Sequence, residues 1–363
     1  MDEQLSWAIV GERVRRSRAA AGLSQQQLAE LGGLERSMIS KLESGDRRID
    51  AIELTRLAQA LDVPLNHFLH QAPEVVSRRA TAVLDIGDVG ETQVDRDAYR
   101  TEVLLAEWLR DVRQLTESGH LTLQPMLRYP RKVTGSADAH AAAHWLRDRL
   151  GIGRNPVESV ADACEMAGQS IAVIRIPSDG AALVDGDTAV AVVDLAQQPG
   201  RRRSTAAHEL GHMVLGDEFS TDLGVHASRD TREAVVEEFA AEFLLPHAVT
   251  RGIADQTAEE GKREALIRLS AIYRVSWSLT LHQAKNARVI DTTQARRLKT
   301  RVPTFAEFQD ALGWRPQPDL DSVRVPPRYA SAVMQAFKAH HVTATRAVEM
   351  LRGQISTGDL SDD

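Results

Sequence analysis

The sequence predicts a mainly α-helical protein with an N-terminal five-helix domain, a following α+β domain that contains a small sheet, and a small helical C-terminal region. Residues 6–70 consist of short amphipathic segments separated by Gly, Ser and Asp, which is the pattern of several short helices. Residues 170–176, 181–184 and 189–195 are β-rich runs bounded by Gly, Pro and Asp, and they predict three strands. The helical period returns from residue 204 onward.

The length of 363 residues suggests two to three domains, at about 150 residues per domain. Breaks in the helical pattern predict a domain over residues 1–72, a linker and a long helix over 73–134, an α+β domain over 135–298, and a helical region over 299–363. Several prolines set the last region apart, and a final helix is expected over roughly residues 327–352.

Composition excludes several classes of protein. Apolar residues make up 43% and charged residues 26% of the chain, which excludes a disordered or fibrous protein. The net charge of −7 means that any nucleic-acid contact must come from a local patch. With Cys164 as the single cysteine, a metal site would need His and carboxylate ligands. No apolar h-region follows the N-terminal arginines and no apolar run approaches about 18 residues, so we expect a soluble cytoplasmic protein with no membrane partner.

Two short helices joined by a glycine turn are predicted near the N-terminus. Ser24 and Gln27 have the spacing of a capping box, which begins a helix that runs to about residue 31. The Gly-Gly pair at residues 32–33 permits a tight turn, and a second helix is expected over residues 35–44. Two short helices in this arrangement form a helix-turn-helix.

The residues of this region resemble the Xre/Cro family of repressors over about 60 residues, with every spacing intact. The chain departs from the family at Ile49, where Pro is common. The resemblance rests on Leu23-Ser24-Gln25, Leu28-Ala29, Gly33-Leu34, Ile39-Ser40, Glu43, Gly45, Leu54, Leu57-Ala58, Leu61 and Val63-Pro64.

The resemblance implies a set of DNA-binding residues. Gln25 would bind a phosphate, and Arg36, Ser37 and Lys41 would face base edges in the major groove. The implied partner is a double-stranded DNA operator that is bound by a homodimer.

The same resemblance implies a buried ion pair between Arg18 and Glu43. Residues 1–72 hold nine Arg and Lys against ten Asp and Glu, a net charge of −1, so attraction to phosphates should be confined to local patches. The alternative for this region is a helical scaffold that only dimerises or binds protein.

Residues 208–212 read His-Glu-Leu-Gly-His, which is the H-E-x-x-H pattern of zinc enzymes. Ser204 is expected to cap the helix that carries it. On a helix, residues i and i+4 lie on one face, so His208 and His212 can bind one Zn²⁺. Glu209 lies one position further round and can reach the attacking water. A catalytic site then needs a third ligand and an open position.

The third ligand is expected to be a carboxylate on the helix predicted over residues 233–245. At about 100° per residue, Glu233 falls inside the apolar arc of this helix and Glu237 at its margin, whereas Glu238 and Glu242 point away from it. A carboxylate on a buried face needs a partner, and zinc would be one. The spacing therefore favours Glu233 and leaves Glu237 as the second choice.

Residues of this region resemble the ImmA/IrrE family of zinc metallopeptidases over roughly residues 135–290. The resemblance rests on the run RRRSTAAHELGHMVLG from residue 201, on Glu233, and on FAAEFLLP from residue 239. It implies a zincin-like domain with zinc on His208, His212 and Glu233, and with Glu209 as the general base. The chain departs from the family at Glu237, where Asn or Asp is usual, and this keeps the choice between Glu233 and Glu237 open.

These observations predict a DNA-binding transcriptional regulator with a zinc endopeptidase domain. By resemblance, the substrate would be an Xre-type repressor, either this chain or a separate one, in a stress or mobile-element response. A regulator whose zinc domain is a non-proteolytic sensor or scaffold is the alternative, and a pure protein-interaction module is a third. The presence of Glu209 favours the peptidase, because structural zinc does not need it.

Other histidines receive less weight. His226 lies between the expected ligands in sequence and is a candidate for the oxyanion donor. His140 and His144 also have i,i+4 spacing, but the alanines between them supply no base. We therefore expect one zinc ion per chain.

Overall fold

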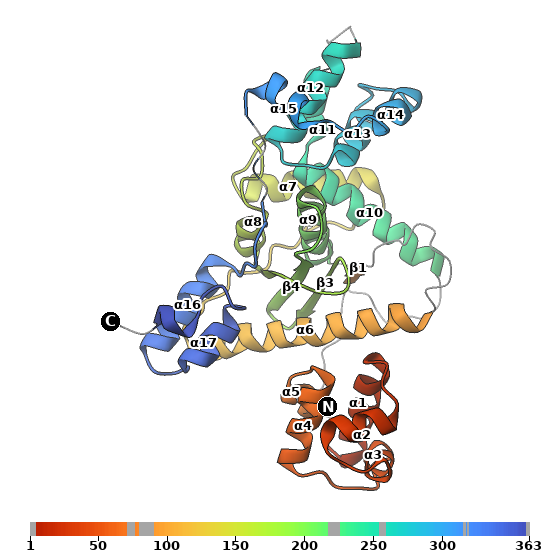
Figure 1. The fold of residues 1–363 in the computed structure, drawn as a ribbon. Coiled ribbons are helices and arrows are strands. Elements are labelled where there is room, and N and C mark those ends of the chain that lie inside the picture. The colour runs from red at the N-terminus through yellow and green to blue at the C-terminus, as the bar shows by residue number, and fades with distance from the viewer. Residues whose placement is uncertain are drawn as a thin grey trace.

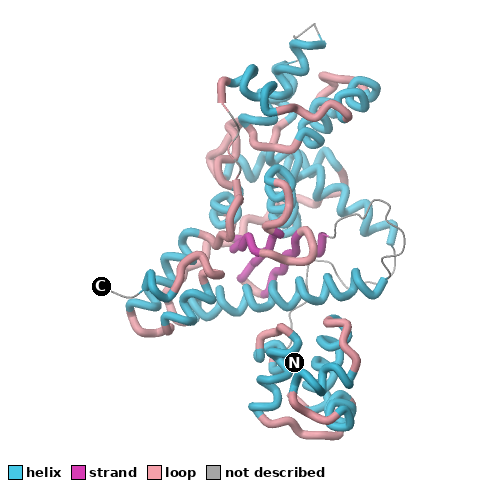
Figure 2. Tube along the Cα trace, viewed as in Figure 1, coloured by secondary structure: helices cyan, strands magenta, loops and turns pink. Residues whose placement is uncertain are grey.

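The structure, a computed structural model, describes residues 5–70, 77–79, 91–216, 226–253, 259–314, 317 and 319–360. Helices dominate it, and a single small sheet lies at its centre (Figures 1 and 2). The predicted fold class is therefore confirmed. No helix in these described ranges is long and apolar enough to cross a membrane.

Five short helices form the N-terminal domain around their own apolar core. The expected capping box of Ser24 and Gln27 is present, with Gln27 N donating to Ser24 Oγ at 3.2 Å and Ser24 N to Gln27 Oε1 at 2.8 Å. Gly33 then adopts a left-handed conformation, which ends the first helix of the pair. The helices are α1 (Trp7–Ala20), α2 (Gln25–Gly32), α3 (Arg36–Glu43), α4 (Ala51–Leu61) and α5 (Leu65–Leu69).

The sheet has four strands, one more than the sequence predicts. The three expected runs form β2 (Gln169–Ile174), β3 (Gly180–Asp185) and β4 (Thr188–Asp194), and the fourth is β1 (Ser77–Arg79) from the connection after the N-terminal domain. The strand order is β1-β3-β4-β2, with β2 parallel to β4 and the other pairs antiparallel. A three-residue strand has too short a pattern to be recognised in sequence.

Alternating side chains of β2, β3 and β4 enter two separate cores, one on each face of the sheet. One face is covered by α7 (Ser136–Arg149), α8 (Val160–Met166), α9 (Pro199–Leu215) and α10 (His226–Leu244). The opposite face is covered by the long helix α6 (Glu91–Glu117) together with α16 (Pro327–Lys338), α17 (Ala344–Met350) and the 3-10 helix η2 (Thr357–Leu360).

Contacts between α6 and the C-terminal helices hold this second layer together. Trp108 packs on Tyr329 with ring centroids 4.5 Å apart, and its indole N–H donates to Ser170 O at 2.8 Å. Asp111 is buried and accepts hydrogen bonds from Arg346 and Arg352. The final helices thus pack on one face of the sheet together with α6 and do not form a separate domain.

A further helical group lies beyond α10 (Figure 1). The group comprises α11 (His247–Thr250), η1 (Arg251–Ile253), α12 (Glu259–Ile272), α13 (Trp277–Asn286), α14 (Thr292–Lys299) and α15 (Phe305–Leu312). It has its own core, to which α12, α13, α14 and α15 contribute. Part of the region that the sequence analysis begins at residue 299 therefore packs here, and part packs against α6.

The N-terminal domain contacts α6 on the side away from the sheet (Figure 1). At this contact the Tyr99 hydroxyl of α6 lies beside His67 Nε2 of α5 and 2.7 Å from Ser17 Oγ of α1. Burial lowers the pKa of His67 from 6.5 to about 4, and the nearby cations Arg110, Arg13 and Arg16 act in the same direction.

Candidate metal centre and DNA-binding face

Helix α9 places the H-E-x-x-H residues between the sheet and α10. The expectation that Ser204 caps this helix is wrong, because α9 begins at Pro199, where the fixed φ of proline suits the first helical turn. Ser204 lies inside the helix and its hydroxyl donates to Gly200 O at 3.0 Å. Gly216, in a left-handed conformation, ends the helix.

The structure brings His208, His212 and Glu233 together. The His208 and His212 Nε2 atoms lie 3.0 Å apart, and Glu233 Oε2 lies 3.1 Å from the first and 3.8 Å from the second. Four-coordinate zinc with bonds of about 2.0–2.1 Å separates its ligand atoms by about 3.3 Å, so these distances fit a zinc ion. The donor set of two imidazoles and one carboxylate is also one that zinc favours.

The two alternatives for the third ligand lie in different surroundings. The side chain of Glu233 is 30% exposed and faces the two imidazoles. Glu237 is exposed and lines a cavity of about 510 Å³ beside Arg201 and Ser204. Among the described residues, it does not belong to the group of side chains around His208 whose ligand atoms lie within 4.8 Å of one another. The geometry therefore favours Glu233.

Glu209 is completely buried beside the two histidines. Gly180, the first residue of β3, packs against it: a Cβ there would lie 2.5 Å from Thr205 Cγ2 and 3.1 Å from Glu209 Oε1. Any larger residue at position 180 would push on the helix that carries the histidines. The sequence contains no local signal for this contact, because residues 180 and 209 belong to separate elements.

Gly211 explains how α10 comes close enough to α9 for Glu233 to reach the histidines. A Cβ at this position would lie 2.9 Å from both Phe239 Cδ1 and Val236 Cγ1. A glycine inside a helix is otherwise unfavourable by about 1 kcal/mol relative to Ala, so its presence between the two histidines is the sequence signal for this close packing. The side chain of His226, the candidate oxyanion donor, lies outside the described residues.

The residues expected to contact DNA lie on α2 and α3. Arg36, Ser37 and Lys41 are all exposed on α3. Gln25, at the first position of α2, is partly buried, and its side-chain amide donates to Glu43 Oε2 at 2.8 Å. In this structure the Gln25 side chain is therefore held by a carboxylate, whereas the sequence assigns it to a phosphate.

The expected ion pair beneath this face is confirmed. Arg18 donates through Nε at 2.6 Å and through Nη2 at 3.1 Å to the two oxygens of Glu43, and through Nη1 to Leu23 O at 2.7 Å. The Glu43 side chain is only 4% exposed and that of Arg18 17% exposed. The pair joins α1 to α3 and holds the start of α2 through Gln25.

Comparison with known proteins identifies both regions. Residues 14–68 match the model of the helix-turn-helix family, and residues 169–285 match the model of the IrrE N-terminal-like domain. The chain joins a helix-turn-helix domain to an IrrE N-terminal-like domain. The two resemblances inferred from the sequence are thus confirmed, and the histidine pair lies in the second matched region.

Relatives in sequence match the helix-turn-helix domain. A helix-turn-helix-type transcriptional regulator from Sinorhizobium medicae is 39% identical over 64 residues, which is 18% of this chain and 46% of that protein. A transcriptional regulator in the ATPase CF(0) region of Rhodospirillum rubrum is 44% identical over 61 residues, 17% of this chain and 56% of that protein. The chain thus spans about half the length of these relatives.

Among solved structures, the restriction-modification controller protein C.AhdI from Aeromonas hydrophila is 39% identical. The match covers 17% of this chain and 94% of that one, with a TM-score of 0.17.

Proposed function

We propose that this protein is a DNA-binding transcriptional regulator whose second domain is a zinc-dependent endopeptidase. The observation that carries the proposal is the convergence of His208, His212 and Glu233 beside the buried carboxylate of Glu209. These three side chains would hold zinc, and none of them needs to move far from its position. Zinc, when bound, supplies a Lewis acid that polarises a scissile carbonyl and lowers the pKa of a water molecule.

Glu209 would be the general base of the reaction. Its carboxylate would accept a proton from the attacking water and pass it to the leaving amine. Its complete burial beside the start of β3 fixes its position relative to the histidines. A purely structural metal site has no use for such a residue, because the two histidines and Glu233 supply the ligands.

The edge of β3 is the place where we expect a peptide substrate to bind. In this structure β1 pairs with β3 in an antiparallel register that sets Arg79 opposite Gly180, and Gly180 is the residue that packs against Glu209. An extended backbone therefore fits this edge through main-chain hydrogen bonds. We propose that the substrate is an Xre-type repressor segment that pairs with β3 in the position that β1 occupies here. A separate repressor would have to displace β1, and β1 itself makes the connection within this chain the other candidate.

The helix-turn-helix domain would direct the protein to a double-stranded operator. Arg36, Ser37 and Lys41 on the exposed side of α3 would read base edges, and a phosphate would bind near Gln25 at the start of α2. We expect a homodimer on a pseudo-palindromic site with half-sites about 34 Å apart. Cleavage of a repressor would then relieve repression in a stress or mobile-element response.

The experiment that tests the proposal is incubation of the zinc-loaded full chain with candidate Xre-type repressors, followed by mass spectrometry of the fragments. Fragments of this chain at low protein concentration, at a rate independent of that concentration, would indicate cleavage within one molecule. Fragments of the added repressor would indicate cleavage of a separate protein. Each must disappear in the Glu209→Gln variant, because a fragment that persists there comes from a contaminating protease.

The alternative is a regulator whose zinc domain binds metal without cleaving protein. One observation favours it: Glu237 stands near Glu233 on α10 where the resembling family has Asn or Asp. Intact repressors, intact regulator and normal operator binding with bound zinc would establish this alternative.

A further inference from the structure

Helix α10 carries a second group of histidine and glutamate side chains on the face opposite to Glu233. Glu242 follows Glu233 by nine residues, which is about 180° round the helix and about 13 Å along it. On the helical wheel of α10, Glu242 falls outside the apolar arc. The structure instead buries it completely, because α7, α11 and α13 cover this side of α10.

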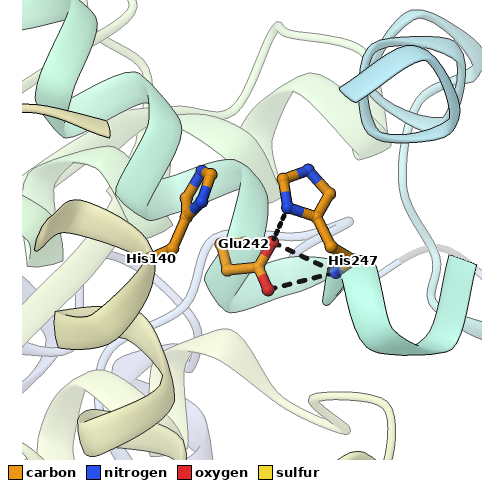
Figure 3. A group of neighbouring side chains, drawn as sticks. All are labelled: His140, Glu242 and His247. Atoms are coloured by element: carbon orange, nitrogen blue, oxygen red, sulfur yellow. Dashed lines mark hydrogen bonds and ion pairs between the residues drawn. The ribbon is translucent and has the colours of Figure 1, made fainter. Parts of the chain in front are cut away.

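Three side chains from three helices converge there (Figure 3). His140 comes from α7, Glu242 from α10 and His247 from α11, and each offers one ligand atom within 4.8 Å of the other two. His247 Nδ1 lies 3.1 Å from Glu242 Oε2, the same spacing as between His208 Nε2 and Glu233 Oε2. The donor set of two imidazoles and one carboxylate is also the same.

Glu242 is the buried centre of this group, and polar side chains surround it. Its side chain is 1% exposed, and it accepts hydrogen bonds from the backbone N–H of His247 and from Gln283 Nε2 at 3.1 Å. Its Oε1 also lies 2.9 Å from Nε2 of His144, the second histidine of α7. Because this carboxylate is buried, a cation bound to it and to His247 Nδ1, the ring nitrogen that faces it, would stabilise its charge.

A second carboxylate orients one of the rings. His140 Nε2 lies 3.0 Å from Glu238 Oε2, and His282 Nε2 lies 2.9 Å from the other oxygen of the same carboxylate. Histidines that bind metal commonly give their other ring N–H to a carboxylate, which fixes the tautomer and raises the basicity of the ligand nitrogen. Glu238 is placed to do this for His140.

We propose that His140, Glu242 and His247 form a second binding site for a divalent transition metal, with zinc as its natural occupant. Imidazole and carboxylate ligands suit zinc, and a water molecule would complete four-coordination. Because its ligands come from α7, α10 and α11, the ion would fix α10, the helix that also carries Glu233. Glu242 would be engaged as a ligand and Glu238 is held by His140 and His282, so neither carboxylate is placed to act as a general base, and the ion would stabilise the fold.

The test is the zinc content of the full chain, stripped with a chelator, reloaded with Zn²⁺ and analysed by native mass spectrometry. We expect two ions per chain in the wild type, in place of the one expected from the sequence, and one ion each in His247→Ala and His208→Ala, since each variant empties a different site. His282→Ala is the matched control: it removes a histidine bound to Glu238 but outside the ligand set, and it should keep both ions.

Two results would overturn the proposal: a His208→Ala variant that holds no zinc although it is folded, or equal zinc loss in His247→Ala and His282→Ala. If His247→Ala does not fold, His140→Ala serves instead, because His140 is more exposed. This measurement does not depend on the proposed peptidase activity, since zinc retained by the His208→Ala variant reports on the second site alone. Loss of zinc from His247→Ala together with full retention in His208→Ala would support the second site and contradict the first.

Discussion

The helix-turn-helix domain and the IrrE N-terminal-like domain each place a glutamate beside side-chain nitrogen atoms, but the chemical groups that carry these nitrogens differ. Glu43 receives a permanently charged guanidinium fork from Arg18 and an amide from Gln25. Glu233 instead faces two imidazoles, which as neutral rings carry lone pairs that suit a metal. The charge of Glu43 is thus balanced by a cation of the chain itself. Glu233 has no such cation among the two imidazoles it faces, and these imidazoles could bind a metal together with it.

The same contrast appears in solvent exposure. Glu43 is almost fully covered, as a stabilising pair inside a core must be. Glu233 remains partly exposed, which leaves room for an ion and a substrate to approach. Substitutions in the first group should therefore change the stability of a domain, and substitutions in the second should change zinc binding and peptide cleavage with little effect on the fold.

The largest effect is expected from Glu209→Gln. Gln preserves the size of the side chain but cannot accept a proton, so peptide cleavage should fall by about 10²–10⁴-fold, the usual contribution of general-base catalysis. Zinc content and operator binding should not change, because Glu209 is neither an expected ligand nor part of the DNA-binding face. The measurement is the rate of fragment formation under single-turnover conditions, and an unchanged rate would exclude Glu209 as the base.

Local sequence patterns were sufficient to predict much of the structure of the helix-turn-helix domain and of the IrrE N-terminal-like domain. The capping box at Ser24, the turn at Gly33 and the Arg18–Glu43 pair all depend on short spacings or on a family pattern, and the structure confirms them. The H-E-x-x-H spacing likewise places His208 and His212 together whatever the rest of the fold does.

Contacts between distant segments could not be predicted in this way. A helical wheel for α10 identifies one apolar arc, but α10 is covered on both sides, so Glu242 is buried where the wheel places it outside. The pairing of β1 with β3, and the packing of α16 on α6, depend on residues separated by more than 100 positions. Such pairings have no local signal in a single sequence.

Arg18→Ala should have the next largest effect, on stability. It leaves the Glu43 carboxylate buried without its guanidinium, and breaking a buried pair in this way costs about 3–5 kcal/mol. Amide hydrogen exchange of α1 to α5 in the full chain would measure the loss. The matched control is Arg15→Ala, which breaks an exposed pair with Glu12 on the same helix and should cost less than about 1 kcal/mol. Equal losses would show that the buried pair stabilises the domain no more than the exposed pair does.

Glu233→Ala and Glu237→Ala together test the choice of ligand. Removal of a zinc ligand should weaken zinc binding at this site by more than about 100-fold, which exceeds the usual effect of residues that only orient ligands. Glu237→Ala should leave zinc affinity within a few-fold of the wild type, because this side chain lies outside the group around the histidines. Competition with a chromophoric chelator gives both affinities. Full zinc binding in Glu233→Ala with loss in Glu237→Ala would reverse the assignment.

On the other domain, Arg36→Ala should weaken binding to the specific operator by about 1–3 kcal/mol and binding to random DNA very little, since a base-edge contact carries sequence information. Fluorescence anisotropy with both DNA molecules at one salt concentration makes the comparison. Equal losses on the two DNA molecules would instead identify Arg36 as a phosphate contact.

The smallest predicted effect concerns pH and the contact between the helix-turn-helix domain and α6. Because burial lowers the pKa of His67 to about 4, the unfolded or undocked chain binds more protons than the docked chain between about pH 4 and pH 6.5. The stabilisation from neutral His67 is therefore complete well above pH 6.5 and is lost as the pH falls toward 4, by about 1.4 kcal/mol at pH 5.5. Amide exchange of α5 and α6 at pH 7 and pH 5.5 should show this weakening. His67→Gln should abolish the difference, whereas His70→Gln, which changes an exposed histidine three residues away, should retain it. A pH dependence that survives in His67→Gln would show that another group controls the contact.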